Sequence, residues 1–141
     1  MRLYLDTNIL IFLLNEKKSL DNNVLEILFD YSNVFYTSTV CVHELIHLSQ
    51  IGKILWKKQN GKPFIAEDVL GSLHEMSIEI KTITEKHLAQ YASLPIIKDH
   101  HDPFDRLIIA QAISDKATLV SSDLKFKWYE KYGLDFIQNN R

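Results

Sequence analysis

Cysteine is scarce in this chain of 141 residues, which contains Cys41 alone. An intramolecular disulfide is therefore excluded, and a reducing compartment is the natural expectation. Because Cys41 lies in an apolar stretch, we interpret it as a small buried hydrophobic residue. A chain of this length buries roughly 68% of its unfolded surface, so it can fold without disulfides or a structural metal. Any metal that it binds is expected to be functional.

The sequence also lacks long hydrophobic runs, internal repeats and low-complexity segments. Residues 9–14 are apolar but too few to cross a bilayer, and no apolar leader precedes Asp6. We therefore expect a cytoplasmic protein without membrane contact. Its length and composition predict a single domain over residues 1–141.

An excess of one charge is missing as well, because the formal net charge is only −2. The overall charge gives no case for binding nucleic acid, so any attraction to phosphates must be local. One basic segment with an aromatic side chain could provide it, and it contains Lys53, Trp56, Lys57, Lys58 and Lys62. The alternative interpretation of this segment is a solvated helix end and loop.

Short apolar strands and helical patterns alternate along the chain. Residues 3–5, 34–37, 78–83 and 117–120 are predicted strands. Helices are predicted after Asp6, after Ser38 through residue 48, and from Asp102-Pro103 to about residue 114, since each start carries capping residues. Residues 59–63 and 93–103 resemble loops. This alternation predicts an α/β fold with helices on both faces of a mainly parallel sheet.

Four acids fall where such a sheet binds ligands, outside the carboxyl ends of its strands. Asp6 ends the first predicted strand and Asp123 follows the fourth, while Glu44 and Asp105 lie in helices near the same edge. Glu44 and Asp105 have apolar neighbours at helical spacing, which predicts partial burial. Partly buried like charges repel, and a divalent cation would relieve that repulsion. Oxygen ligands favour Mg²⁺ or Mn²⁺, which activate water against phosphodiesters.

Each acid also has a purely structural interpretation. Asp6 and Asp123 could stabilise helix dipoles, and Asp105 could belong to an arrangement like a capping box with Asp102. Asp102 itself could be a helix cap, a supporting group or an outer ligand, and the Asp-Pro pattern favours the cap. The joint placement of Asp6, Glu44, Asp105 and Asp123 at one edge favours the metal site.

The acids stand in segments that resemble the successive motifs of PIN-domain nucleases. These segments are Leu5-Asp6-Thr7-Asn8, Val42-His43-Glu44-Leu45, Asp102-Pro103-Phe104-Asp105-Arg106 with the helix that follows, and Ser121-Ser122-Asp123. The matching segments occur in the family's order from Met1 to about Phe136. Within that family, the sequence most resembles the small bacterial VapC-type toxins. The third segment, at its proper distance before Ser121-Ser122-Asp123, is the most specific part.

The resemblance implies a three-layer α/β/α sandwich of four or five strands and an endoribonuclease that needs Mg²⁺ or Mn²⁺. It also implies a homodimer and inhibition by a partner antitoxin. By motif position, the metal and catalytic residues would be Asp6, Glu44, Asp105 and Asp123, supported by Thr7, Asn8 and Ser121. Many relatives have threonine at the place of Ser121, and serine keeps the hydroxyl.

Two other functions remain open from the residues alone. The segment His43-Glu44-Leu45-Ile46-His47 matches the H-E-x-x-H pattern of zinc peptidases, although no third histidine follows at the extended spacing. Later residues that could fold back as a third ligand are Glu67, His74, Glu75 and His87. A PIN-like fold could also serve as a non-catalytic protein-binding module. The pair His100 and His101 is interpreted as an exposed loop feature rather than a substrate contact.

Overall fold

Strands and helices alternate along the chain in the computed structural model, which describes residues 1–54 and 66–141. The strands are β1 (Arg2–Leu5), β2 (Val34–Ser38), β3 (Ile78–Lys81), β4 (Thr118–Ser121) and β5 (Asp135–Gln138). The α-helices are α1 (Thr7–Asn15), α2 (Asn22–Leu28), α3 (Thr39–Gln50), α4 (Asp68–Glu75), α5 (Glu85–Ser93) and α6 (Pro103–Asp115). Two 3₁₀ helices are η1 (Lys17–Ser19) and η2 (Leu124–Tyr132).

The five strands form one parallel sheet in the order β3-β2-β1-β4-β5. From β1 the chain adds β2 and β3 on one side, then crosses over to add β4 and β5 on the other. In such sheets the connections leave a crevice at the carboxyl ends of the strands where the order reverses. That position lies between the ends of β1 and β4, where Tyr4 pairs with Leu119 and Leu5 with Val120.

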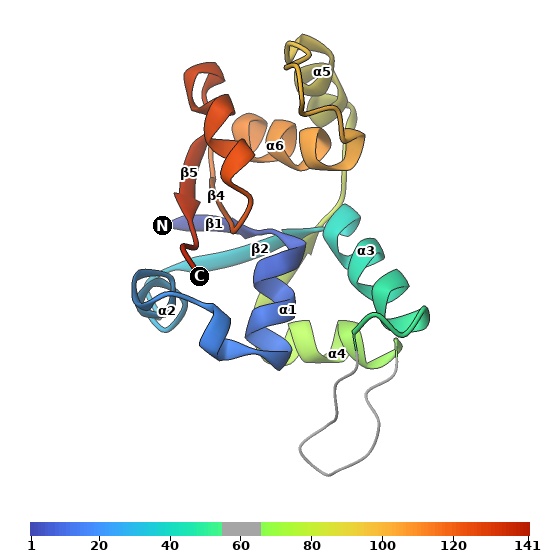
Figure 1. The fold of residues 1–141 in the computed structure, drawn as a ribbon, viewed down its shortest axis with the longest axis vertical. Coiled ribbons are helices and arrows are strands. Elements are labelled where there is room, and N and C mark those ends of the chain that lie inside the picture. The colour runs from blue at the N-terminus through green and yellow to red at the C-terminus, as the bar shows by residue number, and fades with distance from the viewer. Residues whose placement is uncertain (55–65) are drawn as a thin grey trace.

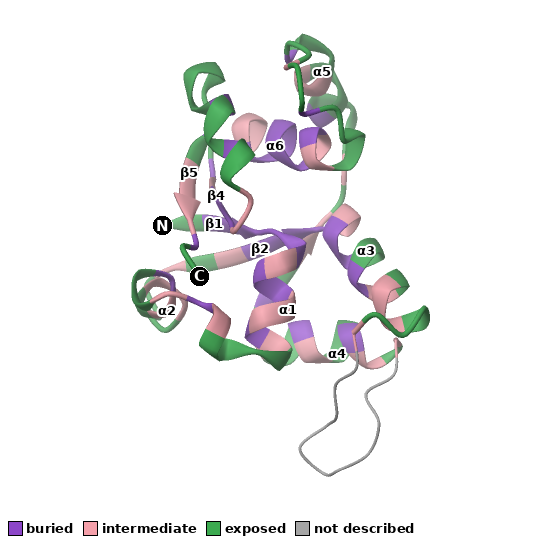
Figure 2. Ribbon diagram, viewed as in Figure 1, coloured by how far each residue is buried: buried purple, intermediate pink, exposed green. Residues whose placement is uncertain are grey.

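Helices cover both faces of the sheet, as Figure 1 shows with α5 and α6 above it and α1, α2 and α4 below it. Most of β1 and β4 and the carboxyl half of β2 are buried in Figure 2, because a parallel sheet covered on both faces has no solvated side. Helix α1 buries Ile9, Leu10 and Leu13, which recur at helical spacing. No helix in the described part of the chain is long and apolar enough to cross a membrane.

The predicted α/β sandwich is confirmed, and the four predicted strands correspond to β1 through β4. The third strand was predicted too long, because it ends at Lys81 rather than residue 83. Lys81 pairs with Ser38, the last residue of β2, so the chain beyond it has no partner strand. The fifth strand, β5, pairs with β4. The loop predicted over residues 59–63 lies outside the described residues.

Candidate active site

Asp6 occupies the turn between β1 and α1, at the carboxyl edge of the sheet. It is the N-cap of α1, and its Oδ1 accepts a hydrogen bond of 2.8 Å from the backbone N–H of Thr7. The side chain is buried, as is Thr7. Its other oxygen, Oδ2, accepts hydrogen bonds from Ser121 Oγ at 2.6 Å and Asn8 Nδ2 at 3.3 Å. These donors hold the Asp6 carboxylate in one orientation.

Ser121 and Asn8 connect this turn to the end of β4. Asn8 Nδ2 donates to Ser121 Oγ at 3.2 Å, and Asn8 Oδ1 accepts from the backbone N–H of Ser122 at 3.1 Å. Ser121 Oγ also accepts from the backbone N–H of Asp123 at 3.0 Å. Two of the side chains expected to support the acids, Asn8 and Ser121, therefore cross-link the segments that carry Asp6 and Asp123.

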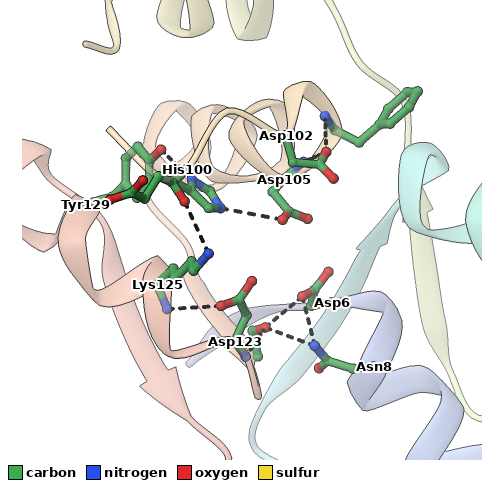
Figure 3. A network of polar contacts seen from close by, with 11 residues as sticks. Asp6, Asn8, His100, Asp102, Asp105, Asp123, Lys125 and Tyr129 are labelled. Atoms are coloured by element: carbon green, nitrogen blue, oxygen red, sulfur yellow. Dashed lines mark hydrogen bonds and ion pairs between the residues drawn. The ribbon is translucent and has the colours of Figure 1, made fainter. Parts of the chain in front are cut away.

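Asp123 follows β4 and caps the next helix, η2. Its Oδ1 accepts a hydrogen bond of 3.0 Å from the backbone N–H of Lys125. Figure 3 shows Asp6 and Asp123 on one side of a common space and Asp105 on the other side, reaching in from α6. Three of the four acids predicted for the site therefore face one another.

Asp102 and Asp105 have different positions in the first turn of α6. Asp102 is the N-cap, since its Oδ1 accepts from the backbone N–H groups of Phe104 at 2.9 Å and Asp105 at 3.2 Å. Pro103 occupies the first turn, as the sequence predicted. Asp102 is exposed, whereas Asp105 is half-buried and directed toward Asp123. The capping interpretation of Asp102 is confirmed.

Burial and mutual repulsion make these carboxyl groups hard to ionise. Burial, with the charges of Glu44 and Asp123 adding to it, raises the pKa of Asp6 to about 6, despite the hydrogen bonds that lower it. Burial raises the pKa of Asp105 to about 8, and the charges of Asp6, Asp102, Asp123 and Glu44 contribute in the same direction. Such shifts are typical of buried carboxyl groups clustered in a functional site.

Glu44 differs from the expectation of partial burial, because it is exposed. The buried residues of α3 are Cys41, Val42 and Leu45, so Glu44 lies at the margin of the buried stripe rather than within it. Its charge still raises the pKa of Asp6 and of Asp105, which places it on the site's side of α3. Cys41 is fully buried, as its apolar surroundings predicted.

His100 was expected to be exposed together with His101, and this was wrong for His100. His101 is exposed, but only 4% of His100 is accessible to solvent. Nitrogen and oxygen atoms of His100, Asp105 and Asp123 all lie within 4.8 Å of one another. No local pattern indicates the burial of His100, because the hydroxyl that contacts its ring belongs to Tyr129, 29 residues further along the chain.

The H-E-x-x-H segment lies on α3 with His43, Glu44 and His47 all exposed. Within residues 1–54 and 66–141, His43 and His47 form no group with a third histidine, cysteine or acid close enough to hold a metal. Of the possible later ligands, His87 is buried and its Nε2 contacts Asp115 Oδ1 at 2.8 Å. The described residues therefore do not favour the zinc peptidase.

The proposed basic segment is described only in part. Lys53 is exposed just beyond the end of α3. Trp56, Lys57, Lys58 and Lys62 lie outside the described residues.

Comparison with known proteins places this chain in one family. The family model described as "PIN domain" matches residues 3–132, so the chain belongs to the PIN-domain family. No curated protein matches the sequence. Among solved structures, a chain of VapBC2 from Rickettsia felis, bound to a DNA fragment from its promoter, is 26% identical. That likeness covers 99% of both chains with a TM-score of 0.67.

Two further solved structures share the fold at lower identity. A chain of VapBC-1 from nontypeable Haemophilus influenzae is 19% identical over 100% of both chains, with a TM-score of 0.64. A chain of DNA-bound VapBC from Salmonella typhimurium is 17% identical over 98% of both chains, also with a TM-score of 0.64. The predicted resemblance to PIN domains of the VapC type is confirmed.

Proposed function

We propose that this chain is a metal-dependent endoribonuclease that hydrolyses RNA phosphodiester bonds, with residues 1–141 forming one nuclease domain. The observation that carries the proposal is the arrangement of Asp6, Asp105 and Asp123 around one space at the sheet's carboxyl edge. Two of these groups have a strongly raised pKa, which is typical of a functional site, and a bound cation would stabilise their ionised forms. The PIN-domain family membership agrees with this interpretation.

The donor set fits a divalent cation. Asp6, Glu44, Asp105 and Asp123 offer carboxylate oxygens, the ligands that Mg²⁺ and Mn²⁺ prefer. The pKa of Asp105 is raised partly by the other carboxylates, and a cation would remove this repulsion. When bound, such an ion supplies an activated water and neutralises charge on the phosphate.

The chain's own residues hold the acids in place for this chemistry. Ser121 and Asn8 donate to Asp6, so its carboxylate is oriented before any ligand arrives. Asp102 caps α6 and thereby fixes the turn that presents Asp105. Preorganised groups of this kind avoid reorganisation during the reaction, which is a large part of enzymatic rate enhancement.

We further propose that the protein is the toxin of a toxin–antitoxin pair, acts in the cytoplasm as a homodimer, and is inhibited by a cognate antitoxin. The support is the likeness to chains of VapBC complexes, at 26% identity over 99% of the chain in the Rickettsia felis example. Expression of the chain alone should arrest growth, and co-expression of its cognate antitoxin should restore growth. A partner that binds without affecting cleavage would instead favour the protein-binding module.

The testing experiment is incubation of the purified protein with single-stranded RNA and with DNA of the same sequence. We expect RNA cleavage that stops with a chelator and returns with Mg²⁺ or Mn²⁺. Cleavage that survives thorough chelation would remove the metal from the proposal. Cleavage of the DNA alone would correct the substrate, and cleavage of neither strand would favour the non-catalytic module.

A further inference from the structure

The imidazole of His100 is enclosed on the wall of the acidic site. It lies in the loop before α6, and its backbone N–H donates to Ile97 O at 3.1 Å. The rings of Phe126, Trp128 and Tyr129 pack around it edge to face, with centroids 5.3 to 6.5 Å away. Its Nδ1 lies 2.6 Å from the Tyr129 hydroxyl. The ring therefore has a fixed position and one satisfied nitrogen.

The other nitrogen, Nε2, is buried and has no hydrogen-bond partner. It lies 3.5 Å from Asp105 Oδ2, which is within ion-pair distance, but the two atoms form no hydrogen bond. A buried polar atom without a partner costs roughly 1 to 3 kcal/mol, so such atoms usually have a reason to persist. Figure 3 shows the ring between Tyr129 and Asp105, with Asp123 across the same space.

We propose that His100 Nε2 is a nitrogen ligand for a divalent cation that it shares with Asp105 and Asp123. The proposal rests on the proposed function, since it assumes that the acidic site holds a metal. The three donor groups lie within 4.8 Å of one another, and each is anchored by a separate element: the loop before α6, α6 itself and the start of η2. A bound ion would provide the partner that Nε2 lacks.

Tyr129 is the positioning residue for this ligand. A metal-binding histidine needs its other nitrogen to carry the proton, and the partner of that N–H fixes both tautomer and ring orientation. The Tyr129 oxygen can accept the proton of Nδ1–H at 2.6 Å, which leaves the Nε2 lone pair free to bind. Tyr129 is fully buried, so this partner is held in place.

A nitrogen ligand changes which ions the site prefers. Carboxylate oxygens suit Mg²⁺ and Mn²⁺ alike, whereas imidazole favours transition ions over Mg²⁺. The site should therefore bind Mn²⁺ more tightly than Mg²⁺, and His100 should account for part of this preference. Removing the ring should weaken Mn²⁺ binding by about tenfold or more, and weaken Mg²⁺ binding less.

The test is pulsed electron paramagnetic resonance of the Mn²⁺-loaded protein, which detects nitrogen bound to the ion. Wild-type protein should show a ¹⁴N coupling that becomes a ¹⁵N coupling when histidine alone is labelled. The signal should vanish in His100→Gln and persist in the matched control His101→Gln, whose side chain is exposed. In Tyr129→Phe the nitrogen coupling should persist, but titration calorimetry should show weaker Mn²⁺ binding, as expected for a positioning residue.

Several results would overturn the proposal. Bound Mn²⁺ without nitrogen coupling in the wild type would exclude His100 as a ligand, and this measurement needs no variant to fold. A coupling that is lost in His43→Gln or His47→Gln would assign the nitrogen to α3 instead. In either case, RNA cleavage by the Mn²⁺-loaded protein would leave the proposed nuclease intact. Failure to bind Mn²⁺ together with metal-independent cleavage would reject both.

Discussion

The Ser121 hydroxyl donates a hydrogen bond of 2.6 Å to Asp6, which joins the carboxyl ends of β1 and β4. The same oxygen accepts from the backbone N–H of Asp123 at 3.0 Å and from Asn8 Nδ2 at 3.2 Å. This one buried hydroxyl therefore contacts both the segment after β1, which carries Asp6, and the segment after β4, which carries Asp123. We therefore expect Ser121 to orient the Asp6 carboxylate rather than to react.

Replacing Ser121 with alanine should lower both stability and cleavage. The change leaves buried partners of the hydroxyl unsatisfied, which costs roughly 1 to 3 kcal/mol of unfolding free energy. It also frees the Asp6 carboxylate to turn away from the site. Ser121→Thr keeps the hydroxyl and should retain most activity. Urea unfolding and RNA cleavage measure the two effects, and an alanine variant equal to wild type in both would contradict this role.

Without a divalent ion, the folded protein should become less stable as pH rises. Burial raises the pKa of Asp6 to about 6 and that of Asp105 to about 8, both above their ordinary value of 3.8. Between about pH 4 and about pH 8 the folded state therefore holds more protons at these groups than the unfolded state does. Raising pH through this window lowers the free energy of unfolding.

Thermal melting at several pH values in chelator measures this effect. Asp105→Asn should weaken the dependence, because one of the two titrating groups is gone. Saturating Mg²⁺ should also weaken it, because the ion favours the ionised carboxylates. A pH dependence that is identical in wild type and Asp105→Asn would show that the carboxyl cluster is not its cause.

The histidines of the H-E-x-x-H segment should be dispensable for cleavage. His43 and His47 are exposed on α3, and the described residues supply no third ligand for them. His43→Ala and His47→Ala should therefore cleave RNA at close to the wild-type rate with Mg²⁺. Stoichiometric zinc that is lost in both variants would revive the peptidase interpretation.

The lysines of the basic segment from Lys53 to Lys62 should contribute to RNA affinity if this segment contacts the phosphate backbone. For a single strand, each lost phosphate contact reduces the slope of log binding constant against log salt concentration by about 0.7. Lys57→Gln with Lys58→Gln should therefore flatten the salt dependence. The pair Lys17→Gln with Lys18→Gln, which is exposed in η1, removes equal charge elsewhere and should not. If the two double variants show the same salt dependence of RNA binding, the segment is better interpreted as a solvated surface.

The sequence sufficed for the features that depend on local chemistry. Capping residues located the starts of α1, α3 and α6, because a side-chain oxygen that accepts a helix N–H is a local interaction. β-branched and apolar runs located the central strands. The parallel arrangement then placed Asp6 and Asp123 at one edge without any knowledge of tertiary contacts.

Features that depend on residues far apart in the chain could not be predicted from local sequence patterns. The burial of His100 arises from aromatic residues of η2, and Tyr129 lies 29 residues further along the chain. Likewise the exposure of Glu44 depends on which neighbours pack against α3, and helical spacing alone does not determine this at the margin of a buried stripe. Tertiary packing decides both cases.

The first turn of α6 should separate structure from catalysis. Asp102 caps the helix through two backbone N–H groups, whereas Asp105 faces Asp123 in the site. Asparagine caps a helix about as well as aspartate does, while alanine costs roughly 0.5 to 2 kcal/mol. Asp102→Asn should therefore fold normally and keep appreciable activity. Asp102→Ala should mainly lose stability.

Asp105→Asn removes a charge from the proposed metal site with almost no change in side-chain volume, so it should abolish cleavage without unfolding the protein. In chelator at neutral pH it should even melt at a higher temperature than wild type, because burial and the neighbouring carboxylates oppose ionisation of Asp105 in the folded state and asparagine removes that cost. RNA cleavage and thermal melting, with and without Mg²⁺, measure these outcomes for wild type and all three variants. If Asp105→Asn stays active while Asp102→Asn is inactive, Asp102 rather than Asp105 belongs to the reacting site.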